Sequence, residues 1–88
     1  MLSEIKWDLI KNDRLKSTRG ISFEDLLNKG NLIAVKRHPK KENQSIMLFE
    51  YKKYIWIVPF VRDEDGTIFL KTLYPSRKYT KIYKGDNL

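Results

Sequence analysis

Residues 46–61 read IMLFEYKKYIWIVPFV, in which two runs of β-branched and aromatic residues are joined by Lys52 and Lys53. Such runs are typical of β-strands, and a two-residue connection between them is typical of a tight hairpin. We therefore predict antiparallel strands over 46–51 and 54–61. The second run is apolar on both faces, which favours a central place in the sheet, and Pro59, which has no amide proton to donate, implies a bulge there.

Two further runs of the same kind lie on either side of this hairpin. One covers residues 32–35 and the other covers 67–74, and the polar residues 63–66 form a turn between the hairpin and the second run. Consecutive strands joined by short turns pair antiparallel. We therefore expect a four-stranded antiparallel meander.

Before the strands, capping residues predict two helices. Asp8 is a candidate N-cap for a helix through about Thr18, and Gly20 supplies the left-handed residue that often ends a helix. Ser22 begins a second helix, with Asp25 in the position of the usual capping-box glutamate, and this helix ends near residue 30. The first third of the chain is therefore expected to be a pair of helices.

A third helix is predicted after Pro75, with Ser76 as its N-cap. At about 100° per residue, its two sides differ in character. One side carries Arg77, Lys81 and Lys84, and the other carries Tyr79, Ile82 and Tyr83, which we expect to pack on the sheet. For Tyr74, Tyr79 and Tyr83 the alternative is a role in stacking on bases or in proton transfer. The predicted fold class is α+β, with two N-terminal helices, a four-stranded antiparallel meander and a short basic C-terminal helix in one domain over residues 1–88.

The chain is strongly basic. Eighteen Lys and Arg side chains against eleven Asp and Glu give its 88 residues a formal charge of +7. Between Gly66 and Gly85 the cations occur without any acid, and they are Lys71, Arg77, Lys78, Lys81 and Lys84. A surface of this kind favours a polyanionic partner such as a nucleic acid. A solvated basic face without a partner is the alternative.

Cysteine is absent and histidine occurs once, which excludes disulfides and thiol chemistry and disfavours a zinc site. The first residues lack the apolar run of a secretory signal, and no run of about eighteen apolar residues occurs. We expect a cytoplasmic protein that does not enter a membrane.

Most catalytic classes lack their motifs in this sequence. It contains no glycine-rich phosphate loop, no nucleophile elbow, no HExxH and no cysteine nucleophile. Its acids are scattered, and Asp63, Glu64 and Asp65 fit a turn better than a magnesium site. These residue types permit RNA cleavage without metal or cofactor, in which the 2′-hydroxyl attacks the neighbouring phosphate and leaves a 2′,3′-cyclic phosphate.

Arginine suits that reaction because its planar, permanently charged fork grips two phosphate oxygens. We predict Arg62, at the end of a strand, and Arg77, at the start of the last helix, as catalytic residues. His38 is the candidate acid or base, because imidazole readily exchanges protons near neutral pH. The residues predicted to bind RNA are Lys71, Lys78, Lys81 and Lys84. A surface residue without such a role is the alternative at each position.

Several short strings resemble the BrnT-type ribonuclease toxins of type II toxin-antitoxin systems, which share a compact fold with the RelE toxins. Trp7 and Asp8 are followed by GISFE at 20–24, and IFLK at 68–71 leads to SRKYTK at 76–81. The resemblance covers nearly the whole chain. It implies that Arg77 is the family's helix-start arginine and that Arg62 is the arginine that closes its central strand.

Two positions depart from the pattern of that family. Arg19 stands where the family often has His, and Lys81 or Ile82 stands where it has Glu. If the acid or the base of the reaction lies at one of these positions, it therefore differs from the residue that the family uses.

The sequence favours a metal-independent endoribonuclease toxin that inhibits translation and is neutralised by a cognate antitoxin. The resemblance implies an antitoxin with a ribbon-helix-helix DNA-binding half, which carries two toxins in a heterotetramer. The alternatives are a non-catalytic nucleic-acid-binding module and a domain that binds an acidic protein.

Overall fold

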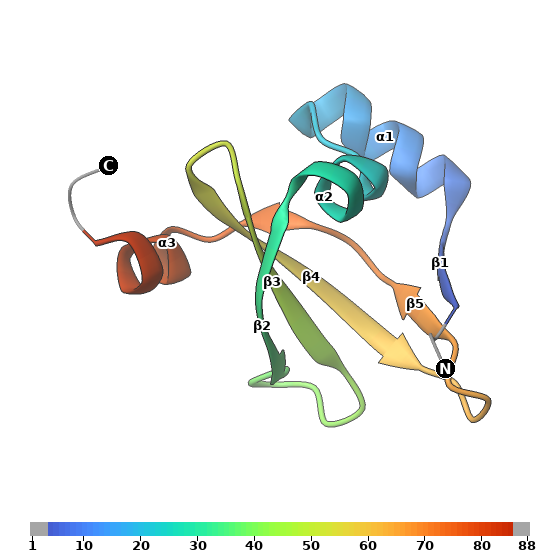
Figure 1. The fold of residues 1–88 in the computed structure, drawn as a ribbon. Coiled ribbons are helices and arrows are strands. Elements are labelled where there is room, and N and C mark those ends of the chain that lie inside the picture. The colour runs from blue at the N-terminus through green and yellow to red at the C-terminus, as the bar shows by residue number, and fades with distance from the viewer. Residues whose placement is uncertain (1–3, 86–88) are drawn as a thin grey trace.

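The computed structural model describes residues 4–85 and shows an α+β fold (Figure 1). The elements follow one another as β1 (Ile5–Trp7), α1 (Leu9–Arg19), α2 (Phe23–Lys29), β2 (Asn31–Arg37), β3 (Ser45–Tyr51), β4 (Tyr54–Arg62), β5 (Ile68–Leu70), β6 (Tyr74–Pro75) and α3 (Arg77–Lys84). Across the described residues the strands form one sheet in the order β1-β5-β4-β3-β2, and β6 also pairs with β4. The predicted α+β class is confirmed.

The hairpin of β3 and β4 lies in the middle of the sheet, as the sequence predicts. Its strands pair antiparallel from Tyr51 opposite Tyr54 to Ser45 opposite Phe60, without a shift of register. On its other side β4 pairs with β5 and β6. Most residues of β4 are therefore buried.

The predicted four-stranded antiparallel meander is wrong in two respects. A short strand, β1, precedes the helices and pairs parallel with β5, with Ile5 opposite Ile68, so the sheet is mixed. The strand predicted over 67–74 is divided into β5 and β6. Three residues are too few to show the strand period, and the partner of β1 is distant in the sequence, so local pattern does not indicate β1.

Pro59 accounts for the division between β5 and β6. Its carbonyl accepts a hydrogen bond from the Lys71 amide at 2.8 Å, so the edge of β4 that faces β5 lacks an amide donor at the proline. The ladder stops after Leu70 and resumes at Tyr74, and Leu73 between them is fully buried. β4 and β3 pair through Pro59 in unbroken register. On its other side β4 changes register at this point, because its residues 58–59 face the three residues 71–73 between β5 and β6. The irregularity predicted at Pro59 therefore lies on the side of β5 and β6.

All three predicted helix starts are confirmed by their caps. Asp8 accepts a hydrogen bond from a first-turn amide of α1 at 3.0 Å, and Ser76 does the same in α3 at 3.1 Å. Ser22 and Asp25 form a reciprocal capping box with distances of 3.1 and 3.0 Å. Gly20 ends α1 with a φ of 75°, the left-handed conformation that glycine adopts without strain.

The helices α1 and α2 lie together on one face of the sheet (Figure 1). Trp7 of β1 packs at the edge of this layer, with its ring centre 5.8 Å from that of Phe23. The larger core of the protein lies between the helices and the sheet, and its burial is a main driving force for folding. It contains Leu15, Ile21, Phe23, Leu26, Met47, Phe49, Val58, Phe60, Ile68, Leu70 and Leu73.

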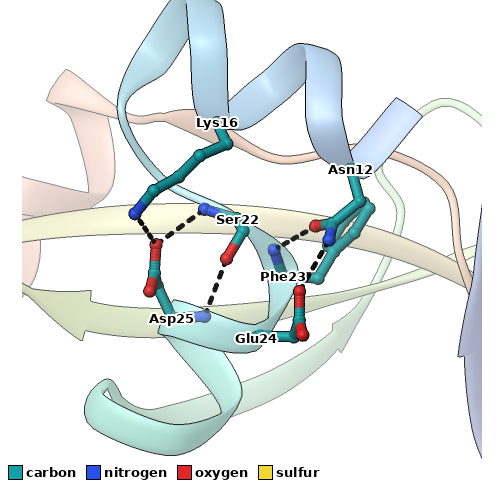
Figure 2. A network of polar contacts seen from close by, with 6 residues as sticks. All are labelled: Asn12, Lys16, Ser22, Phe23, Glu24 and Asp25. Atoms are coloured by element: carbon teal, nitrogen blue, oxygen red, sulfur yellow. Dashed lines mark hydrogen bonds and ion pairs between the residues drawn. The ribbon is translucent and has the colours of Figure 1, made fainter. Parts of the chain in front are cut away.

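A buried amide side chain joins the two helices (Figure 2). Asn12 of α1 accepts a hydrogen bond from the Phe23 amide at 2.8 Å and donates one to the Glu24 carboxylate at 2.7 Å. The ion pair between Lys16 and Asp25, at 2.8 Å, is a second link. The Asn12 contact satisfies an amide at the start of α2 that has no partner within its own helix. These contacts fix α2 relative to α1.

The Asp25 contacts predict a loss of stability in acid. The hydrogen bond from Lys16, aided by the Ser22 amide, lowers the pKa of the Asp25 carboxyl from 3.8 to about 2. Its contribution to stability is therefore complete above pH 3.8 and is lost as the pH falls from there to about 2. Asp25→Asn should lower the free energy of unfolding near neutral pH by about 1 kcal/mol, the usual value of a helix cap, and should reduce the loss seen in acid.

Urea unfolding at both ends of this pH range measures the two effects. Asp13→Asn, at an exposed acid of α1, is the control and should leave the acid sensitivity unchanged. An Asp25→Asn variant that loses as much stability in acid as the wild type would contradict this role.

The opposite face of the sheet carries α3 over a smaller core. This core consists of Ile46, Leu48, Ile55 and Ile57. Thr80 fixes the helix there: it is 1% exposed, and its hydroxyl accepts a hydrogen bond from the Ile55 amide at 2.9 Å and donates one to the Ser76 carbonyl at 2.6 Å. Tyr79 packs against the same core.

The predicted packing of α3 is wrong in part. Tyr79 faces the sheet as expected, but Ile82 is 61% exposed and Tyr83 is 39% exposed. The hydroxyl contacts turn the helix so that Thr80 lies at the centre of the packed side. Hydrophobic periodicity does not single out a polar residue for that position.

Candidate nucleic-acid interface

The charges of the chain are unevenly distributed over the fold. Residues 8–30, which contain α1 and α2, hold five basic and four acidic side chains, whereas residues 31–85 hold twelve basic and five acidic ones. The net positive charge therefore lies on the sheet and α3, not on the two N-terminal helices.

The two ends of the sheet also differ in charge. At the end where β4 finishes, five basic residues are balanced by five acidic ones, and we call this the balanced end: Lys6, Arg37, Lys40, Lys41, Arg62, Glu4, Glu42, Asp63, Glu64 and Asp65. At the other end, α3 lies beside the start of β4 (Figure 1). The basic residues here, which we call the cationic end, are Lys52, Lys53, Arg77, Lys78, Lys81 and Lys84. Among the acids of the described residues, Glu50 lies here and pairs with Lys84.

Arg77 and three of the four predicted RNA-binding lysines lie at the cationic end. Arg77, Lys78 and Lys81 are exposed, and none of them makes a salt bridge within the described residues. Lys84 differs, because it pairs with Glu50 and is mostly covered. The first three cations are therefore the ones available to an anionic ligand.

The fourth predicted lysine, Lys71, lies away from the helix. Its ammonium group is 5.6 Å from the centre of the Phe69 ring. Phe60 belongs to the larger core, so the next residue, Val61, points to the opposite face of the sheet, which carries α3. Phe69 pairs with Val61 and therefore lies on that face too. Lys71 thus extends the positive charge along that face.

The structure does not bring Arg62 and Arg77 together. Pro75, two residues before Arg77, lies opposite Trp56 near the start of β4, and Arg62 ends that strand. The strand from Trp56 to Arg62 spans about 20 Å. The two arginines lie at opposite ends of the sheet, and one phosphate cannot contact both.

His38 lies at the balanced end, in the loop between β2 and β3. Its Nδ1 accepts hydrogen bonds from the amides of Lys40 and Lys41 at 3.1 and 3.2 Å. The open hollow beside it is lined by residues 37–43 alone, so it belongs to one loop. Because Nδ1 is occupied by the loop, Nε2 is the nitrogen that remains for proton exchange with a ligand.

A cluster of lysines and tyrosines adjoins the cationic end, and Lys36 is the member of it that the sequence does not indicate. Lys36 of β2 holds its ammonium group 5.7 Å from the centre of the Tyr79 ring and 5.9 Å from that of Tyr83. Lys78 also lies 5.7 Å from the Tyr79 ring, and the two rings are 6.2 Å apart. The apolar run that predicts this strand ends at residue 35, so Lys36 lies outside the predicted strand although it is part of β2. Cations among partly exposed aromatic rings are the combination that binds single-stranded nucleic acid.

This surface has the chemistry to bind phosphates and bases. Arg77, the first residue of α3, can contact two phosphate oxygens at once, and the positive end of the helix dipole adds to its field. Among residues 4–85, no three His, Cys, Asp or Glu side chains gather where they could hold a metal ion. No helix in the described part of the chain has the length and hydropathy needed to cross a membrane.

The arrangement of helices and strands is similar to that of a small ribonuclease toxin. That toxin is BrnT from Brucella abortus, whose crystal structure matches with a TM-score of 0.59 over 85% of this chain and 97% of that chain, at 16% sequence identity. Similarity at this identity shows a shared fold. No protein-family model and no curated protein matches the chain.

Proposed function

We propose that the chain is an endoribonuclease toxin of the BrnT type, with a RelE-like domain over residues 1–88 that cuts RNA bound at its cationic end. The main support is the unbalanced positive charge of that end, in a fold shared with a ribonuclease toxin. Arg77, Lys78 and Lys81 supply what an RNA site requires, which is a set of cations that replace the counterions of the phosphates.

The proposed reaction takes place within the RNA itself. The 2′-hydroxyl gives its proton to water as its oxygen attacks the adjacent phosphorus, and the bond from phosphorus to the 5′-oxygen of the next nucleotide breaks. That oxygen takes up a proton from water, and the products are a 2′,3′-cyclic phosphate and a 5′-hydroxyl. The phosphorane formed on the way carries more negative charge than the RNA, and Arg77 stabilises it through contacts to two oxygens. Lys78 and Lys81 hold the neighbouring phosphates.

The other predicted residues have secondary places in this proposal. Lys71 contacts RNA that continues along the sheet, and Lys84 contributes when it leaves Glu50. Arg62 and His38, at the balanced end, contact a distant part of a longer RNA and not the phosphate that is cut. The proposed reaction uses neither a metal nor a cofactor.

Cleavage in the presence of a chelator tests this mechanism. The purified chain should cut single-stranded RNA at the same rate with and without EDTA, because the 2′-hydroxyl and cationic side chains are all that the reaction requires. Mass spectrometry should find a 2′,3′-cyclic phosphate on the 5′ fragment. Arg77→Ala protein purified in parallel controls for contaminating nucleases. A 3′-hydroxyl product, or activity lost on chelation, would indicate metal-dependent hydrolysis instead.

A cognate antitoxin covers the cationic end in this proposal, because a surface of this charge otherwise adheres to cellular RNA. Its toxin-binding segment is acidic with apolar anchors, and the exposed Ile82 of α3 offers one place for such an anchor. Its other half is of the ribbon-helix-helix type and carries two toxins in a heterotetramer. Saturating antitoxin should displace bound RNA. A stable complex of this chain with both the antitoxin and RNA would show that the antitoxin inhibits from a surface other than the cationic end.

A non-catalytic nucleic-acid-binding module is the second candidate. It is favoured because the Glu50 carboxylate at the cationic end already pairs with Lys84, so it is not free to exchange protons with RNA. The cleavage assay separates the two candidates. RNA that is bound in a salt-dependent manner but left intact would select the binding module.

A further inference from the structure

The turn between β3 and β4 has a conformation that its residues do not favour. Lys52 and Lys53 both have positive φ, at 52° and 65°. Most side chains are disfavoured there, because the β-carbon crowds the following carbonyl oxygen. Two-residue turns of this kind usually contain Asn-Gly or Asp-Gly. Two lysines at these positions are therefore a local conflict between residue and backbone.

Neighbouring aromatic residues hold the turn in place. The Trp56 indole donates a hydrogen bond to the Tyr51 carbonyl at 3.2 Å, and the Tyr54 and Trp56 rings pack edge to face with centres 6.4 Å apart. The Lys52 ammonium group lies 5.4 Å from the centre of the Tyr51 ring. Lys52 and Lys53 are both exposed. The strained turn therefore presents two positive charges on a stiff support.

The turn adjoins the start of α3. The Ser76 amide donates a hydrogen bond to the Ile55 carbonyl at 2.9 Å, and Pro75 lies opposite Trp56. Arg77 therefore begins α3 beside the first residues of β4, and the β3–β4 turn lies at the same end of the sheet (Figure 1). An RNA backbone that passes over Arg77 comes within reach of lysine side chains on this turn.

We propose that Lys52 and Lys53 form a second phosphate-binding site, which takes a phosphodiester of the same RNA strand that lies over Arg77. This site rests on the proposed RNA substrate and adds cations from a second element, the β3–β4 turn, at the same end of the sheet as Arg77. It explains why lysines occupy positions that Asn and Gly would fill with less strain. Strain that the surrounding structure maintains is common where a residue serves binding and not stability.

Replacing both lysines tests this site, because stability and RNA binding should change in opposite directions. In Lys52→Asn/Lys53→Gly, Tm should rise by about 4–8 °C as the turn gains residues that suit it. The binding probe is a short 2′-O-methyl RNA, which lacks the attacking hydroxyl and is not cut. Its affinity should fall by about tenfold at low salt, and the slope of log affinity against log salt concentration should fall by about 1.4, or about 0.7 for each lysine.

The matched control is Lys40→Gln/Lys41→Gln, which removes two charges from an exposed pair at the balanced end. It should weaken RNA binding much less than the turn variant does. A turn variant that binds RNA as well as this control would overturn the second site, and so would one that is no more stable than the wild type. A wild-type chain that binds none of the RNA would refute the proposed function itself.

Discussion

Replacing Arg77 by alanine should lower the rate of RNA cleavage at least about a hundredfold, the usual effect of removing one group that stabilises charge in the transition state. Tm should stay unchanged, because Arg77 is exposed and makes no salt bridge within residues 4–85. Single-turnover cleavage of a labelled RNA measures the rate, and thermal unfolding followed by circular dichroism checks the fold.

Two further variants make this result specific. Arg77→Lys keeps the charge but not the contact to two oxygens, so it should recover only part of the rate. Arg62→Ala removes the same kind of side chain about 20 Å away, so it should weaken binding with a smaller loss of rate. If Arg62→Ala abolished cleavage and Arg77→Ala did not, the reaction would have to be assigned to the balanced end, where His38 lies.

Replacing Phe23 by alanine should lower the free energy of unfolding by about 3–5 kcal/mol, as is usual for a buried phenylalanine. The side chain is 1% exposed in the larger core, and its ring packs against Trp7. Small domains have only about 5–15 kcal/mol of stability in total, so the variant should lose a large share of it. Urea unfolding measures this loss.

Leu9→Ala is the control for the Phe23 variant, because Leu9 is 73% exposed at the start of α1. It should change the free energy of unfolding by no more than about 0.5 kcal/mol. Equal losses in the two variants would show that Phe23 does not belong to the centre of the core.

Features that depend on neighbours in the sequence could be predicted well. The caps at Asp8, Ser22 and Ser76 are each defined by a side chain and an amide within one helical turn. The β3–β4 hairpin is likewise encoded by its turn and the two apolar runs beside it. Local hydrogen bonding decides these features before any tertiary contact forms.

Features that depend on distant parts of the chain could not be predicted. Arg62 and Arg77 are attractive partners by chemistry, but β4 and β6 place them at opposite ends of the sheet. Lys36 reaches the rings of α3 only because the sheet brings β2 near that helix. Thr80 is buried because its hydroxyl accepts a hydrogen bond from the Ile55 amide of β4, and no pattern within the helix reveals that contact.

The pairing of β1 with β5 also sets the order in which the chain can fold during synthesis. Proteins emerge from the ribosome N-terminal end first, so α1 and α2 appear before any strand exists to cover Phe23 and Leu26. The β3–β4 hairpin can follow, but β1 must wait until Ile68 has been made. The proposed RNA-binding surface is completed later still, when α3 follows β6. Under the proposed function, a nascent chain that lacks α3 does not yet have the complete surface that binds RNA.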